Sequence, residues 1–394
     1  MLKNKRLVVN LIIIICLISS FIGCEKVNET EITKTDEIVE LKTQDDDTYG
    51  NADEIVELKT QDDDTYGNAD EIVELKTQVA DTYGNADAIV TIISDDGFYM
   101  TGVNLNSIFG KRNLKCTVAG AIVIVDPDLE SWKTLLEDGN IDLVSHSYNH
   151  IRMEDGKKIA RDVDALRHEI VDADKYYEEN LGYEQIVFVC PENQMCKMGY
   201  EILEENGFWA VRRGHRGYNP ISPTEGIEEG QWFNLMVQGV QDEGVDTSVR
   251  NNWIDTAIKD KTWLIEMWHN VVSEMDDRYQ TILLPDAEEH LDYVAEKSIK
   301  NEIWVATFND AVKYLREKQN SKVKAYIDGN QIHLKVELTN DSMSYNTFNQ
   351  PLTVIVNMPE GVSVEENDCI SLLDGTMMVN VVPGEEMVIN IVGE

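Results

Sequence analysis

One stretch decides the fold of this chain, VTIISDDG at residues 90–97. Its apolar, β-branched beginning is typical of a strand buried on both faces of a parallel sheet. Two aspartates and a glycine follow at once, at the point where such a strand ends and a loop begins. Because α/β barrels keep their active sites in the loops after their strands, the stretch predicts a buried strand that leads into a functional site.

A second stretch, IDLVSHSYNH at residues 141–150, has the same organisation. A short apolar run is followed by His146 and His150, which face the same side if these residues form a helical turn. Both imidazoles then reach one metal ion, and Asp96 supplies a third ligand with an open position left for water. A turn at Gly97 brings Asp95 into the same pocket, where a carboxylate can accept a proton.

The metal predicted from these ligands is zinc, which two imidazoles and a carboxylate suit, with other first-row divalent ions as alternatives. A bound divalent ion lowers the pKa of its water from about 16 toward about 7, so that hydroxide forms near neutrality. The pattern therefore predicts metal-dependent hydrolysis.

In order and separation, the two stretches resemble the polysaccharide deacetylases, carbohydrate esterase family 4 with its nodulation-protein-B-like domain. Residues 93–97 are similar to the family's first motif, Thr-Phe-Asp-Asp-Gly, and residues 146–150 are similar to its second. The resemblance implies that Asp95 is the catalytic base and that Asp96, His146 and His150 bind the metal. It also implies an α/β fold, a distorted (β/α)7-type barrel with its groove at the carboxyl ends of the strands.

Three later segments continue the resemblance. Residues 186–191 are similar to the strand and proline of the third motif, which implies that backbone at Pro191 and Glu192 holds the oxyanion and shapes the groove. The family's arginine before that proline is absent here. Residues 207–212 resemble a later strand, whose Arg212 would take over part of the missing charge. Residues 263–269 resemble the last motif, so His269 is the implied general acid.

Strand and helix patterns alternate from residue 88 to residue 320, which predicts a catalytic domain built on a parallel sheet of barrel size. Helices are predicted at residues 157–180 and 288–300. Strands are predicted, besides the one at 90–93, at residues 116–125, 141–145, 186–190, 208–211, 232–237, 263–268 and 303–307. After residue 320 the period changes to two around a hairpin at Asp328 and Gly329, so residues 321–394 predict a small all-β, sandwich-like domain.

The first 24 residues indicate an export signal of the lipoprotein type. Lys3, Lys5 and Arg6 precede an apolar stretch, and Cys24 follows directly after Gly23, as in a bacterial lipobox. We expect Cys24 to carry a lipid, which anchors the protein outside the cytoplasm to the cell membrane or cell surface. A plain N-terminal membrane anchor is the alternative.

A tandem repeat of 17 residues follows, with copies that begin at Asp36, Asp53 and Asp70. The first two copies are identical, and the third diverges at Val79 and Ala80. Residues 25–90 hold twenty Asp or Glu and five Lys, a composition that buries little surface. Residues 25–87 therefore predict a solvated tether that holds the catalytic domain away from the membrane.

Net charge limits the binding partners that we expect, and the cysteines raise the question of a disulfide. The formal net charge of −39 argues against binding to nucleic acid or to anionic lipid. Cys190 and Cys196 are near enough in the chain to form a disulfide in an oxidising compartment, and their spacing leaves that pairing open.

The predicted function is that of a monomeric, exported, metal-dependent hydrolase that removes acetyl groups from an extracellular or cell-wall polysaccharide. Two alternatives remain open. One is hydrolysis of a non-peptide C–N bond in another substrate on the same scaffold. The other is a surface lipoprotein that binds carbohydrate without catalysis. The polymer and the linkage of its acetyl groups, through nitrogen or oxygen, stay open because selectivity lies in the groove loops.

Overall fold

The computed structural model describes residues 72–182, 184–226, 230–240, 242, 244–275, 280–367 and 369–392. The predicted signal segment 1–24, the proposed lipid anchor Cys24 and residues 25–71 of the predicted tether lie outside these residues. None of the helices formed by the described residues is long and apolar enough to cross a membrane.

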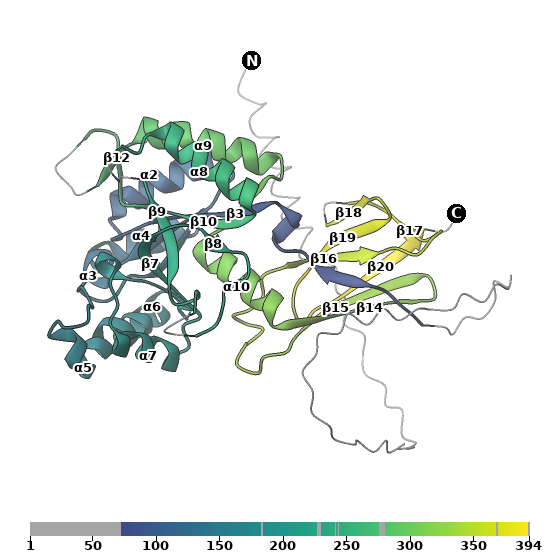
Figure 1. Ribbon diagram of the computed structural model, residues 1–394, viewed down its shortest axis with the longest axis horizontal. Helices are drawn as coiled ribbons and strands as arrows, with labels where there is room; N and C mark the ends of the chain where they lie inside the picture. The colour runs from purple at the N-terminus through teal and green to yellow at the C-terminus, as the bar shows by residue number, and fades with distance from the viewer. Residues whose placement is uncertain are drawn as a thin grey trace, which may run out of the picture. The chain divides into compact units, whose positions relative to one another are not determined.

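Within the described residues, seven parallel strands form a closed barrel, which confirms the predicted α/β barrel (Figure 1). Each strand pairs with the next, and the last strand returns to the first along residues 263–268 and 89–94. The barrel strands are β3 (Ala88–Ser94), β4 (Cys116–Gly120), β5 (Ile141–Ser145), β6 (Val187–Val189), β7 (Ala210–Arg216), β9 (Leu235–Gly239) and β10 (Thr262–Trp268). Shorter strands flank them: β8 (Asn219–Pro220), β11 (Asn270–Val272), β12 (Thr281–Leu283) and β13 (Ile303–Val305).

Strand β3 accounts for the distortion of the barrel. All its residues are buried, as expected for a strand covered on both faces. One of its edges pairs with β10, and the other edge is divided between two neighbours. Ile93 and Ser94 pair with β4, while residues 88–90 pair with β13. The barrel is therefore opened by β13 at its amino-terminal end and closed at its carboxyl-terminal end, where the loops that carry the candidate site residues begin.

Helices connect most of the strands. The α-helices are α2 (Tyr99–Gly110), α3 (Ile122–Val125), α4 (Leu129–Leu136), α5 (Val163–Arg167), α6 (Ala173–Leu181), α7 (Lys197–Glu205), α8 (Thr247–Asp260), α9 (Leu284–Ile299) and α10 (Phe308–Gln319). Shorter turns are η2 (Tyr83–Asn85), η3 (Asp126–Asp128), η4 (Ile159–Arg161), the π-helix η5 (His168–Asp172) and η6 (Pro191–Asn193). Helix α9 begins before the predicted residue 288, because Pro285 is suited to a first helical turn.

Two other predicted elements were wrong in extent. The strand predicted over residues 116–125 ends at Gly120, and helix α3 follows it. The N–H groups of Ile122 and Val123 donate to the carbonyl oxygens of Ser147 and Tyr148 in the loop after β5, so they are not available to a neighbouring strand. The helix predicted over residues 157–180 is divided into η4, α5, η5 and α6, with the π-turn placed where a glutamate turns toward that same loop.

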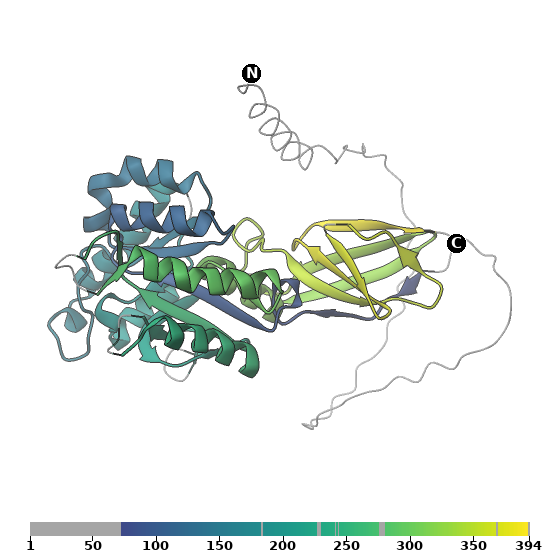
Figure 2. The same ribbon diagram turned by 90° about the horizontal axis from the view of Figure 1, so that it is seen from above.

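The C-terminal region consists of two antiparallel sheets, as the period of two predicted (Figure 2). The predicted hairpin is present, with Asp328 paired to Gln331 across the turn. One sheet contains β14 (Ser321–Asp328), β15 (Gln331–Leu338), β20 (Glu386–Val392) and β17 (Ser363–Val364). The other contains β16 (Leu352–Asn357), β19 (Thr376–Val381) and β18 (Ile370–Leu373).

Residues 72–87, which the sequence placed in the tether, are folded instead. Strand β1 (Val73–Glu74) pairs antiparallel with β14, and β2 (Thr77–Val79) pairs antiparallel with β16. The segment thus adds one strand to each sheet of the sandwich. Leu75 and Val79 pack against the core. The acidic composition of the repeats as a whole hides these two apolar contacts, which explains why the prediction was wrong here.

Candidate active site

The loop after β3 turns both aspartates toward one cavity at the carboxyl ends of the strands. The Asp95 N–H donates to the carbonyl of Trp268 at 2.9 Å, which continues the pairing of β3 with β10. Asp96 and Gly97 then adopt φ values of 81° and 89°. A Cβ atom on Gly97 would lie 2.7 Å from the Cα of Gly120, so only glycine fits this turn without displacing the backbone of β4.

The loop after β5 carries the two histidines, but it is not the helical turn that their spacing predicted. Ser147 and His150 have φ values of 72° and 57°, which a right-handed helix excludes. The His150 N–H donates instead to the Ser147 hydroxyl at 3.0 Å. The resulting tight loop still places the two imidazole rings 4.9 Å apart.

A buried glutamate, which the sequence reasoning missed, holds this loop in place. Glu169 lies in the π-helix and is 1% exposed. Its carboxylate accepts hydrogen bonds from the backbone N–H and from the side-chain amide of Asn149, each at 2.8 Å. The Glu169 carbonyl accepts from the Tyr148 N–H. A charged residue on the buried face of an otherwise amphipathic helix was the signal that could have identified it.

Asp96, His146 and His150 form the one group within the described residues whose His, Cys, Asp or Glu ligand atoms lie close enough to share a metal ion. The Asp96 Oδ1 lies 3.3 Å from His150 Nε2 and 4.0 Å from His146 Nε2. Two ligands that each lie about 2.1 Å from zinc are at most about 4.2 Å apart, so both distances fit one ion.

The protonation of this group also suits a metal. Burial lowers the pKa of His146 to about 4, so its imidazole is neutral. Its Nδ1–H donates to the Val189 carbonyl at 2.8 Å, which leaves Nε2 with its lone pair facing the group. Burial opposes ionisation of Asp96, but the hydrogen bond from His150 and the electrostatic effect of the neighbouring histidines outweigh it and lower the Asp96 pKa. The same hydrogen bond raises the pKa of His150, so a metal ion there competes with a proton.

Asp95 differs from Asp96 in its partner, which is an arginine and not a histidine. Arg212, fully buried on β7, donates from Nη2 to Asp95 Oδ2 at 2.5 Å and from Nη1 to the Asn193 side chain at 3.1 Å. The other carboxylate oxygen, Asp95 Oδ1, is buried and has no hydrogen-bond partner among the described residues. One oxygen of this carboxylate is therefore held by a cation, while the other remains open to an incoming donor.

The third-motif segment forms a wall of the cavity through an unusual backbone. Pro191 is buried at the start of η6, and Glu192 and Asn193, with φ values of 47° and 60°, line the cavity. Such left-handed conformations store strain in residues other than glycine and are common at functional sites. Cys190 and Cys196 are both free, buried thiols in this structure, so the disulfide that their spacing left open is not formed.

His269 lines the same cavity directly after β10. Its backbone is fixed by the Ser94 hydroxyl, which donates to the His269 carbonyl at 2.6 Å. The cavity measures about 580 Å³ and is also lined by Arg216 and Asp242, which sequence reasoning did not select. These two form a bidentate ion pair at 2.5 and 2.6 Å over Gly239, whose missing side chain leaves room for it.

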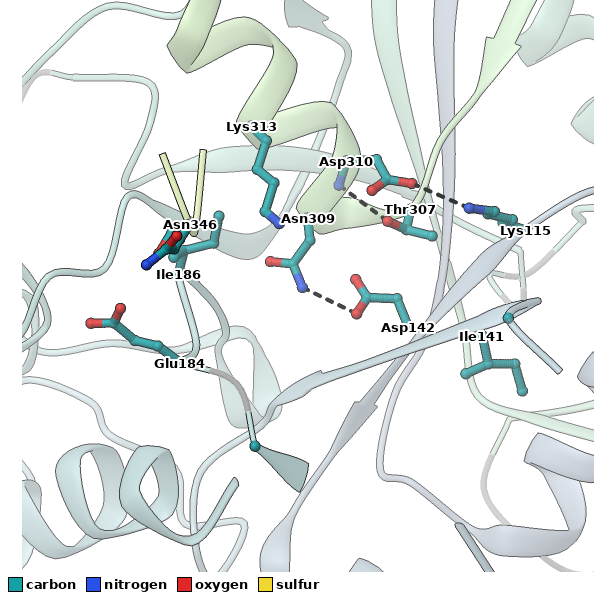
Figure 3. Close-up of a pocket in the computed structure, with 13 residues that line it drawn as sticks. Lys115, Ile141, Asp142, Glu184, Ile186, Thr307, Asn309, Asp310, Lys313 and Asn346 are labelled. Carbon is teal, nitrogen blue, oxygen red and sulfur yellow. Dashed lines mark hydrogen bonds and ion pairs between the residues drawn. The ribbon is translucent and has the colours of Figure 1, made fainter. Parts of the chain in front are cut away.

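A second cavity, of about 450 Å³, is lined by residues at the starts of β4 and β5, and so lies at the opposite, amino-terminal end of the barrel strands. Figure 3 shows its lining side chains. The Asn309 amide donates to Asp142 at 3.1 Å, and Lys115 pairs with Asp310 at 4.0 Å. Burial raises the pKa of Asp142 to about 6, and the negative charge of Asp310 contributes to this increase. This cavity lacks the three-ligand group, so the chemistry is concentrated at the carboxyl ends of the strands.

Several solved structures resemble this chain. A proposed polysaccharide deacetylase from Mycobacterium smegmatis is 14% identical, with a TM-score of 0.47 over 62% of this chain and 96% of that one. A family 4 acetyl xylan esterase from Clostridium thermocellum, in complex with cobalt, is 14% identical, with a TM-score of 0.38 over 57% and 89%. A CE4 family pseudoenzyme from Bacillus anthracis is 13% identical, with a TM-score of 0.39 over 57% and 65%.

No family model and no curated protein matches the chain. The barrel is therefore established by its own strand pairing, and the activity has to be argued from the side chains of the site.

Proposed function

We propose that this protein is a metal-dependent hydrolase that removes acetyl groups from a polysaccharide. The observation that supports the proposal most directly is the geometry of Asp95. This buried carboxylate is held by Arg212 through one oxygen, and its other oxygen has no hydrogen-bond partner among the described residues. Asp95 directly precedes Asp96, one of the three residues suited to bind a metal.

In the proposed reaction Asp95 acts as the general base. Its open oxygen accepts a proton from the water that attacks the acetyl carbonyl, while Arg212 keeps the carboxylate oriented. A divalent ion, when bound by Asp96, His146 and His150, polarises the carbonyl and makes water more acidic. Zinc is the ion that we expect from this ligand set.

Leaving-group departure is assigned to His269, which follows β10 next to β3, and oxyanion stabilisation is assigned to the η6 wall of the cavity. His269 delivers a proton to the departing nitrogen or oxygen, and the backbone N–H of Glu192, which follows Pro191, donates to the oxyanion. The strained backbone at Glu192 supports this assignment, because it turns η6 toward the cavity instead of continuing a regular helix. The general acid and the general base then come from different strands, β10 and β3.

The remaining parts of the proposal rest on the sequence. We propose an exported monomer, anchored through lipid on Cys24, whose acidic segment upstream of residue 72 spaces the barrel from the membrane. An enzyme held outside the cell in this way faces polymers such as peptidoglycan, chitin-like chains or acetylated xylan.

The proposal is tested by acetate release from a panel of acetylated glycans, including N-acetylglucosamine oligomers, together with metal analysis. We expect one divalent ion per chain and loss of activity after chelation. Asp95→Asn is expected to lower turnover by about a hundred- to ten-thousand-fold while the metal stays bound. Asp142→Asn, a buried carboxylate of the other cavity, is the matched control and is expected to leave turnover unchanged. Near-normal acetate release from Asp95→Asn would refute the assignment.

A further inference from the structure

The third copy of the 17-residue repeat, residues 70–86, continues from the sandwich to the edge of the barrel. After β1 and β2 the chain passes through the turn η2 and enters β3 within two residues of the end of the repeat. Most of this copy that the structure describes is in contact with residues more than 200 positions later. This element of the folded domain therefore has two further versions in the same chain.

Residues that all three copies share make many of these contacts. The ring of Tyr83 packs on Trp304 at a centroid distance of 5.6 Å, and its hydroxyl accepts from the Asn380 amide at 3.2 Å. The Gly84 N–H donates to the Thr353 hydroxyl at 2.8 Å. Asp81 pairs with Lys318 at 2.7 Å. The upstream copies contain the same Tyr, Gly and Asp at the equivalent positions.

Both positions at which the third copy differs are turned to the interior. Val79 lies opposite Val354 in the pairing of β2 with β16 and packs against the core. Ala80 is 1% exposed. Its N–H donates to the Thr353 carbonyl at 2.8 Å, and its carbonyl accepts from the buried hydroxyl of Tyr314 at 3.0 Å.

The upstream copies have aspartate at both positions, Asp45 and Asp46 in the first copy and Asp62 and Asp63 in the second. Because Ala80 is 1% exposed, an aspartate in its place would bring a carboxylate into a buried position. Burying an ionised carboxylate without a partner is strongly unfavourable, so neither upstream copy fits this groove as it stands.

We propose that Val79 and Ala80 select the third copy for the groove between strands β14 and β16, and that each upstream copy carries the same docking sequence and is excluded only by its aspartate pair. The occupant of the groove is thus chosen among three segments of one chain by two residues. This choice sets the length of chain between Cys24 and the folded domain, because docking of the second copy would shorten it by one repeat.

Docking of an upstream copy is compatible with the connection to β3. If the second copy occupied the groove, the third copy would form a 17-residue loop between the groove and Ala88. The entropy cost of closing a loop rises only slowly with its length, so the loop alone does not prevent the exchange. The aspartate pair is then what prevents an upstream copy from occupying the groove.

The test moves the Val–Ala pair from the third copy to the second in the full chain. The variant V79D/A80D is expected to lower the thermal midpoint by about 5–10 °C, or to prevent folding. Adding D62V/D63A to that variant is expected to restore most of the midpoint with a monomeric mass in light scattering. The matched control adds D62N/D63N, which removes the same two charges without supplying apolar side chains, and it is expected to restore nothing.

A second measurement identifies which copy is docked. In the original chain Tyr83→Ala is expected to lower the thermal midpoint, while Tyr66→Ala, at the equivalent position of the second copy, has no effect. In the variant V79D/A80D/D62V/D63A we expect the reverse: Tyr66→Ala lowers the thermal midpoint, and Tyr83→Ala has no effect. Failure of D62V/D63A to rescue, rescue by D62N/D63N as well, or rescue only in dimers would overturn the proposal.

Discussion

At the scale of single residues, the two adjacent aspartates differ because their partners come from different strands. Asp96 faces the two imidazoles of the β5 loop, whereas Asp95 is bound to Arg212 of β7. The residue types at 95, 96, 146 and 150 indicated a metal and a base from the sequence. The ion pair with Arg212 joins residues 117 positions apart. The family resemblance singled out Arg212 but did not predict this pair, because no local pattern specifies which cation reaches a given carboxylate.

Arg212→Met is expected to impair both stability and turnover. The substitution keeps most of the side-chain volume but leaves the buried Asp95 carboxylate without its cation, and breaking one partner from a buried ion pair costs about 3–5 kcal/mol. A misplaced base is expected to lower turnover by about 100-fold. Chemical denaturation and acetate release measure the two effects. Arg167→Met, which removes an exposed pair with Glu205, is the control and is expected to change neither. Unchanged activity in Arg212→Met would contradict the positioning role.

At the scale of elements, the site depends on how two strand ends are packed. The β3 loop can turn at Gly97 only because it lies against Gly120, where β4 ends. The β5 loop is held by Glu169 from the π-helix and by the first N–H groups of α3. The strands were predictable from their apolar runs. The π-turn and the early end of β4 were not, because each depends on a contact with the other loop.

Gly97→Ala is expected to destabilise the protein and weaken the metal site. The added Cβ would meet the backbone of Gly120 at 2.7 Å, so the turn that carries Asp96 has to move, at a cost of about 1–3 kcal/mol. Metal affinity by titration and the free energy of unfolding report the two effects. Gly139→Ala is the control, since Gly139 also has a positive φ, of 72°, but has open space around it. Equal effects of the two substitutions would show that backbone strain, not the contact with β4, is responsible.

At the scale of the whole molecule, the barrel and the sandwich share buried polar contacts. Glu317, at the end of α10, is fully buried and accepts from the Gln350 N–H at 3.0 Å, just before β16 begins. Its second carboxylate oxygen has no partner among the described residues. Burial raises the Glu317 pKa from 4.5 to about 8. The side chain is therefore protonated at neutral pH, and its ionisation opposes the folded state.

Stability is expected to fall as pH rises from about 4.5 through about 8, because over this window the unfolded Glu317 is ionised and the folded one is not. Between pH 5 and pH 8 the contribution of this group is on the order of 3 kcal/mol. Glu317→Gln is expected to remove that part of the decline, so its advantage over the original chain grows with pH. Denaturant unfolding at several pH values provides the measurement. A constant difference across the window would contradict the shifted pKa.

The sequence by itself indicated the candidate metal ligands and base at the ends of β3 and β5, the parallel sheet of barrel size and the hairpin at Gly329. Each of these follows from residue types at neighbouring positions or from the period and alternation of apolar residues. Only the tertiary structure decided the partner of Asp95, the support from Glu169, the non-helical course of the histidine loop and the folding of the third repeat. The physical reason is the same in each case. Whether a carboxylate is paired, or an acidic repeat is buried, depends on groups that lie far away in the chain.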